Sequence, residues 1–143
     1  MVEPDVAVDA AHPDVAIAAA HDGRFPDDRT GVQRVNVDVV AQNGTVYVTY
    51  GTRTHPNVAG GTVQQQISVS RNRGSSFAAP QSIGPISVLK YAARADGYFP
   101  GDYIGEAIAG GRLYVVFAQS SPPPPPSSTS KFHQVIWGVT LRP

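Results

Sequence analysis

The chain has 143 residues, no cysteine, and 11 Lys and Arg against 11 Asp and Glu, so its formal net charge is zero. Charged residues make up 15% of it, below the roughly 25% of an average globular domain. These counts exclude disulfides and thiolate metal sites, and they argue against a protein that binds nucleic acid by neutralising phosphates. Fourteen glycines and 13 prolines predict many turns, and hence one all-β unit over 1–143.

Residues 1–34 predict one hairpin followed by a loop. Apolar stretches at Val6–Asp9 and Val15–Ala20 flank a turn that we place at Ala11–Asp14. The loop that follows is too short for two further strands. We interpret this segment as the inner half of a four-stranded unit.

Residues 35–95 predict a complete four-stranded antiparallel unit. Asn43-Gly44 favours a tight hairpin turn, because such turns need positive φ angles. Pro80 indicates that the last strand lies at an edge, and a short helix is expected only within Pro85–Asp96. The length fits one blade of a β-propeller. The predicted strands are Val37–Ala41, Thr45–Tyr50, Val63–Ser70 and Phe77–Ile83.

Residues 96–143 predict three strands of a further unit. Ile104–Ala109 and Arg112–Ala118 flank Gly110-Gly111, which is a second strong hairpin signal. A run of five prolines, Pro122–Pro126, predicts a stiff polyproline II loop. The apolar stretch His133–Leu141 then predicts the third strand, with Trp137 in the core.

The turn Ser70-Arg71-Asn72-Arg73-Gly74-Ser75-Ser76-Phe77 resembles the Asp-box of sialidase-like propellers, the BNR repeat. Asn72 stands where Asp is usual and Ser76 where Thr is usual. A short acceptor at Asn72 can bind backbone N–H groups across the turn, and Gly74 permits a positive φ. The roles are structural, and we expect the aromatic residue to pack between sheets. The matching positions are Ser70, Asn72, Gly74, Ser76 and Phe77.

Two further segments resemble recurring parts of the same family, one at Glu3–Asp9 and one at Pro100–Gly105 with the hairpin after it. The resemblance implies a partial β-propeller of four-stranded blades; a β-sandwich is the alternative, since short strands with frequent turns suit both. A complete ring needs roughly six units of ~45 residues, more than this chain supplies. Either copies of the chain associate as a dimer or trimer that closes a ring, or the chain is part of a longer protein.

Candidate site residues come from loops expected on the ligand-binding face of such a propeller. Arginines can clamp a substrate carboxylate, and sialidase chemistry uses a Tyr nucleophile, a Glu that activates it and an Asp as general acid. The alternative is that the loop residues are solvated surface groups or turn formers. The ligand-binding candidates are Asp22, Arg24, Arg29, Arg53 and Arg94, and the catalytic candidates are Asp102, Tyr103 and Glu106.

Glu106 is the hardest of these residues to explain as a solvated surface group, because it is expected on an innermost strand, where a buried carboxylate is costly unless paired. The four histidines show no metal-ligand spacing, so we expect no metal and no cofactor.

The resulting expectation is a non-catalytic module that binds a glycan or a protein, with no nucleic-acid or membrane partner. The alternatives are a sialidase-like glycoside hydrolase, active only when assembled or in a longer form, and a purely structural or designed fragment. No stretch approaches the ~18 apolar residues of a membrane helix, and the first residues do not have the pattern of a signal peptide. The family resemblance nevertheless implies an extracytoplasmic location.

Overall fold

The computed structural model describes residues 4–20, 32–54, 60–94, 97–101, 104–125 and 132–142. This part of the chain is all-β, as the sequence predicts, and its sheets are antiparallel. Its one helical segment is a single 3-10 turn, η1 (Leu89–Tyr91), inside the stretch where a short helix was expected. No helix in the described ranges is long and apolar enough to cross a membrane.

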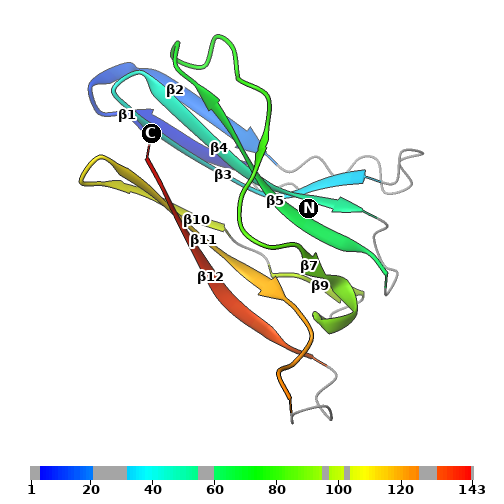
Figure 1. Cartoon of the computed structure of the whole chain (residues 1–143). Helices are drawn as coiled ribbons and strands as arrows, with labels where there is room; N and C mark the ends of the chain where they lie inside the picture. The colour runs from blue at the N-terminus through cyan, green and yellow to red at the C-terminus, as the bar shows by residue number, and fades with distance from the viewer. Residues whose placement is uncertain are drawn as a thin grey trace.

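Three sheets make up most of the fold (Figure 1). The first sheet is the hairpin β1 (Pro4–Asp9) and β2 (His12–Ala20). The middle sheet has the order β3 (Val32–Gln42), β4 (Thr45–Thr54), β5 (Thr62–Ser70) and β6 (Gln81–Ser82), with β7 (Ser87–Val88) also paired to β5. The third sheet is β10 (Ile104–Ala109), β11 (Arg112–Ser120) and β12 (Gln134–Leu141). A small pair, β8 (Ala93–Arg94) and β9 (Tyr98–Phe99), precedes it.

The three sheets form a stack in which β3 contacts both β1 and β10. Figure 1 shows the first sheet on one side of the middle sheet and the third sheet on the other. Side chains alternate between the faces of a strand, so the middle sheet offers one set of residues to each neighbour. Val39, Val46 and Tyr50 are buried on the side of the first sheet. Tyr47 and Ile67 join Leu113, Val115 and Phe117 in one hydrophobic cluster with the third sheet.

The second and third hairpins turn at Asn43–Gly44 and Gly110–Gly111, as their sequences predict. In the first hairpin the turn is at Ala10–Ala11 instead of Ala11–Asp14. The Asp9 carboxylate accepts the N–H of Ala11 and contacts the His12 ring, and these contacts close the chain two residues earlier. The extra residues of β2 are absorbed by a register shift between Val8 and Asp9.

The Asp-box-like turn has the local hydrogen bonds that its residue types predict. Asn72 Oδ1 accepts the N–H of Ser76 at 2.9 Å, and Ser70 Oγ accepts the N–H of Gly74 at 2.9 Å. Gly74 has φ +82°, and Ile17 Cδ1 of the first sheet lies only 2.4 Å from where a Cβ of this glycine would be. The turn therefore also supports the contact between the first and middle sheets.

Two expectations for aromatic residues were wrong, and one for a strand was met only in part. Phe77 and Trp137 are each 42% exposed, because Phe77 lies in the loop after β5 and Trp137 lies on the edge strand β12. Of the predicted strand Phe77–Ile83, Gln81–Ser82 pairs with β5, and Ala78 and Ile83 each donate one backbone hydrogen bond to it. Pro80, which has no N–H to donate, interrupts the ladder just before Gln81–Ser82.

Candidate functional site

Five of the eight sequence-derived site candidates lie outside the described residues. They are Asp22, Arg24, Arg29, Asp102 and Tyr103. The structure places the other three, Arg53, Arg94 and Glu106.

Arg53 and Arg94 both contact Tyr98 on β9, but in different ways. The exposed Arg94 guanidinium lies over the Tyr98 ring, 4.9 Å from its centroid. Arg53, on β4, donates from Nη2 to the Tyr98 carbonyl at 3.0 Å and is partly buried. Its Nε is buried without a hydrogen-bond partner, and burial lowers the pKa of the guanidinium.

Glu106 points from the third sheet toward the middle sheet. It is paired in register with the fully buried Val115, so both side chains lie on the face that meets β3 and β4. Thr49 Oγ1 donates a hydrogen bond to Glu106 Oε1, while Oε2 is buried and has no partner. Burial, and to a smaller extent the charges of Asp38 and Asp5, raise the pKa of Glu106 to about 8 against the opposing hydrogen bond from Thr49.

Asp5, Asp38 and Glu106 form what we call the carboxyl cluster, which joins β1, β3 and β10. The N–H of Val39 donates to Asp5 Oδ2 at 2.8 Å and to Asp38 Oδ1 at 2.9 Å. Burial and the hydrogen bond and charge of Asp5 raise the pKa of Asp38 to about 7, while the hydrogen bond from Asp38 lowers the pKa of Asp5. The two carboxyls therefore titrate as a coupled pair, of which Asp38 is the more desolvated member.

Sequence reasoning missed Asp5, Asp38 and Thr49 as partners of Glu106. Asp5 lies five residues before the first turn residue Ala10, and Asp38 lies five residues before Asn43, so the two carboxyls occupy the same position of successive inner strands. The sequence does not show this match, because it places the first turn at Ala11–Asp14. Their approach to Glu106 depends on how the sheets stack, which no local pattern predicts.

A row of polar side chains continues from Glu106 along the face of the middle sheet that meets the third sheet. Thr49 is followed on β4 by Gly51, which pairs with Gln65, and then by Arg53. Gln65 is 5% exposed and its Oε1 has no hydrogen-bond partner. We call this row the polar seam (Asp38, Thr49, Arg53, Gln65 and Glu106). Three of its members have a buried polar atom without a partner in the protein.

The opposite end of the same interface is lined by apolar residues together with Arg71, Gln81 and Arg142. A cavity of about 140 Å³ lies near the hairpin turns, between Tyr47 and Ile67 of the middle sheet and Leu113 and Leu141 of the third. It has no carboxylate in its lining, so it cannot share the chemistry of the seam. Among the described residues no group of three His, Cys, Asp or Glu side chains is arranged to hold a metal ion.

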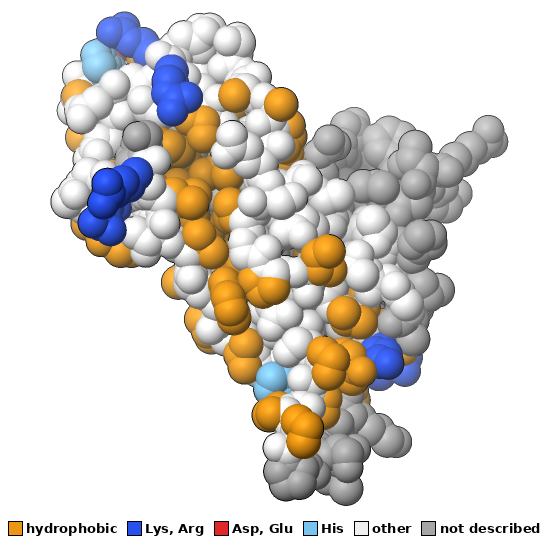
Figure 2. Space-filling model, in the orientation of Figure 1, with side chains coloured by type: hydrophobic (Ala, Val, Ile, Leu, Met, Phe, Trp, Pro, Cys, Tyr) orange, Lys and Arg blue, Asp and Glu red, His pale blue; other side chains and the backbone are white. Residues whose placement is uncertain are grey.

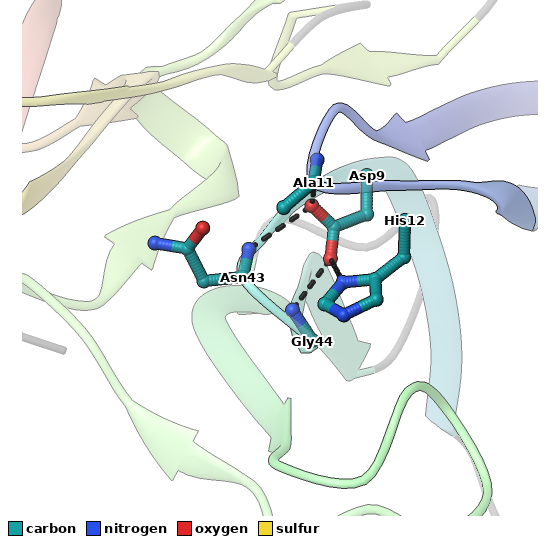
Figure 3. Close-up of polar contacts among 5 residues, drawn as sticks. All are labelled: Asp9, Ala11, His12, Asn43 and Gly44. Carbon is teal, nitrogen blue, oxygen red and sulfur yellow. Dashed lines mark hydrogen bonds and ion pairs between the residues drawn. The ribbon is translucent and has the colours of Figure 1, made fainter.

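Asp9 forms a separate polar centre between the first and middle sheets (Figure 3). Its buried carboxylate accepts the N–H groups of Ala11 and Asn43 at 3.0 Å each and that of Gly44, and it pairs with His12 Nδ1 at 3.0 Å. These hydrogen bonds, led by the one from Gly44, lower the pKa of Asp9 to about 2. These contacts hold the first two hairpins together at their turns. Both carboxylate oxygens of Asp9 already accept hydrogen bonds within the protein, so the arrangement has no open position for a ligand.

The chain matches no family model, no curated protein and no solved structure at a significant level.

Proposed function

We propose that the chain is a sialidase-like β-propeller fragment that serves as a non-catalytic binding module for a polar ligand such as a glycan. Its ring is completed by further copies of the chain. The observation that carries the proposal is the polar seam, where Arg53 Nε, Gln65 Oε1 and Glu106 Oε2 are buried without partners. Buried polar groups in folded proteins are nearly always hydrogen-bonded. A row of three buried polar atoms without partners therefore favours a bound polar molecule or ordered water.

The stacking of the sheets favours a propeller over a β-sandwich. A sandwich packs two sheets face to face, whereas here the middle sheet is covered on both faces. The inner strands β1, β3 and β10 are neighbours, which is the arrangement of first strands around a propeller axis. In this reading the seam runs between two blades and ends at Arg53 and Tyr98, which are partly exposed.

A glycan array with purified protein tests the proposal. We expect wild-type protein to bind a subset of glycans, and Arg53→Ala and Gln65→Ala to weaken that binding at least about tenfold, since each leaves a polar ligand group unpaired. Arg112→Ala is the matched control, because Arg112 is an exposed arginine at a hairpin turn away from the seam. Arg53→Lys, which keeps the charge, separates lost binding from lost folding. Absence of binding by the wild-type protein would overturn the proposal.

One observation favours a second candidate, a glycoside hydrolase related to exo-sialidases and active only in an assembled or longer form. A carboxyl whose pKa is raised to about 8 is protonated at neutral pH, so in this candidate Glu106 would serve as a general acid and not as the residue that activates a Tyr nucleophile. Hydrolysis of a fluorogenic sialoside, abolished by Glu106→Gln or Tyr103→Phe, would replace the binding proposal with this one. No turnover together with glycan binding would exclude it.

A further inference from the structure

The first strands of the three hairpins can be compared position by position when they are counted back from their turns, with the register shift between Val8 and Asp9 absorbing the extra residues of β2. Counted from the turns Ala10–Ala11, Asn43–Gly44 and Gly110–Gly111, the pair Val6–Ala18 corresponds to Val39–Val48 and to Glu106–Val115. On the other face, Ala7–Ile17 corresponds to Val40–Tyr47 and to Ala107–Tyr114. Each hairpin therefore has a forward face, which includes Ile17, Tyr47 or Tyr114, and a rear face, which includes Val6, Val39 or Glu106.

Both interfaces within the chain pack a forward face on a rear face. The forward face of the first sheet meets the rear face of the middle sheet, where Asp5 accepts the N–H of Val39. The forward face of the middle sheet, with Tyr47 and Thr49, meets the rear face of the third, with Leu113 and Glu106. The chain thus builds the same kind of interface twice in succession.

The two faces left over are the rear face of the first sheet and the forward face of the third, and both are apolar and uncovered. Val6 is 59% exposed, whereas its counterpart Val39 is 5% exposed. Tyr114 is 41% exposed, whereas its counterpart Tyr47 is 5% exposed. In Figure 2 hydrophobic side chains gather in a strip over the part of the molecule where Figure 1 draws β12. The exposed residues are Val6, Val8, Ala16 and Ala18 on one face, and Ala107, Tyr114, Val116 and Ile136 on the other.

We propose that the forward face of the third sheet docks on the rear face of the first sheet of a second copy of this chain. The partner is a second copy because the two free faces are the two halves of an interface that the chain already makes twice. They lie on opposite sides of the middle sheet, so they cannot meet within one chain. In the complex Tyr114 takes the place of Tyr47 and packs on Ala16 and Ala18, which correspond to Val46 and Val48.

Two copies of three stacked sheets supply six sheets, which is within the range of closed β-propellers. A head-to-tail contact of this kind closes when the rotation per copy divides a full turn, and a closed ring leaves no apolar face exposed. The inference rests on the proposed propeller and names the surface through which it closes. The glycan assay tests the seam independently of it.

Sedimentation of paired variants tests the docking. We expect the wild-type protein to have twice the mass of one chain, and Tyr114→Asp and Val6→Asp each to have the mass of a monomer, because each buries a charge in both contacts. An equimolar mixture of the two variants keeps one contact intact, so it should regain part of the dimer. Ile86→Asp is the control, since Ile86 is 54% exposed and lies on neither face. A wild-type monomer at micromolar concentration would overturn both the docking and the ring.

Cysteine cross-linking then distinguishes the proposed pairing from any other dimer, and the absence of native cysteine makes it clean. Ala18→Cys and Tyr114→Cys chains, mixed and oxidised, should give a covalent dimer, whereas either variant alone should give none. A dimer cross-linked by Ala18→Cys alone would indicate a symmetric contact and overturn the pairing. If the protein is a dimer but the mixture gives no cross-link, the proposed pairing of faces is wrong, and the copies associate through other surfaces.

Discussion

The two interfaces inside the stack follow one positional rule but use different chemistry. Between the first and middle sheets, carboxylates hold backbone N–H groups, with Asp5 on Val39 and Asp9 on the turn Asn43–Gly44. Between the middle and third sheets, a hydrophobic cluster lies next to a carboxyl whose pKa is raised to about 8 by burial. The comparison teaches that the first interface depends on ionised carboxylates, whereas the second depends on apolar burial and on a neutral one.

The largest expected effect is on the apolar interface. Leu113 has no exposed surface and contacts the middle sheet through the hydrophobic cluster. Leu113→Ala should therefore lower the free energy of unfolding by about 2–5 kcal/mol, measured by chemical denaturation. Ile86→Ala, at a position that is 54% exposed and lies on neither docking face, is the control and should change stability little. Equal losses for the two variants would contradict the packing described.

The second effect is a loss of stability as the pH rises from about 4 to about 8. The folded pKa values of Glu106 and Asp38, about 8 and about 7, lie above their unfolded values, so the protonated forms stabilise the fold. This stability is complete below about pH 4 and is lost as the pH rises through 7 and 8. Thermal unfolding between pH 5 and 9 measures it, and each pKa unit corresponds to about 1.4 kcal/mol.

The Glu106→Gln variant isolates the contribution of this carboxyl to the pH dependence of stability from the contributions of the other titrating groups. Glutamine keeps the shape and the acceptor for Thr49 but cannot ionise, so the melting temperature should fall less between pH 5 and 9 than in the wild-type protein. An unchanged pH profile in this variant would show that Glu106 is ionised in the folded protein.

A third effect has the opposite sign of pH dependence. The pKa of Asp9 is lowered to about 2 from an ordinary value of 3.8, so its contribution is present above pH 4 and is lost as the pH falls through 2. Asp9→Asn should lower the melting temperature by several degrees at pH 7 and flatten the decline between pH 4 and 2. Asp14→Asn, an exposed carboxylate on the partner strand β2, is the control. If both variants melt like the wild type, Asp9 does not hold the hairpins together.

The smallest expected effect is at the Asp-box-like turn. Gly74→Ala places a Cβ against the end of the Ile17 side chain and at φ +82°, where L-residues are strained. Because the end of an isoleucine side chain can shift, the loss should be about 1–2 kcal/mol, mainly from backbone strain. Gly110→Ala, with φ +56° and open space around it, measures the strain alone. If Gly74→Ala lowers the free energy of unfolding no more than Gly110→Ala does, the contact with Ile17 does not contribute to the effect.

Much of the fold could be predicted from the sequence because its turns carry local chemistry. Asn43-Gly44 and Gly110-Gly111 favour positive φ, and the alternation along β5 and the apolar stretch of β12 mark them as strands. The predictions failed where a distant contact decides the outcome. Asp9 closes the first turn on Ala11 and His12, and the same carboxylate is held in place by the N–H groups of Asn43 and Gly44, which follow it by more than 30 residues.

The candidate site was less predictable, for the same physical reason. Glu106 could be singled out alone, because a carboxylate on an apolar strand is costly unless something compensates it. Its partners Asp38 and Thr49 are 57 or more residues away, and only the stacking of β10 on β3 and β4 brings them close. The residue type thus indicated that Glu106 is a candidate functional residue. The stacking and register of the sheets determine which groups it contacts.

The mass of the wild-type protein in solution tests the central claim most directly, that the chain repeats one face-to-face packing and continues it into a second copy. Sedimentation equilibrium at micromolar concentration should give twice the mass of one chain, with Tyr114→Asp at half that value. A stable wild-type monomer, with Tyr114 and Val6 left in water, would contradict it.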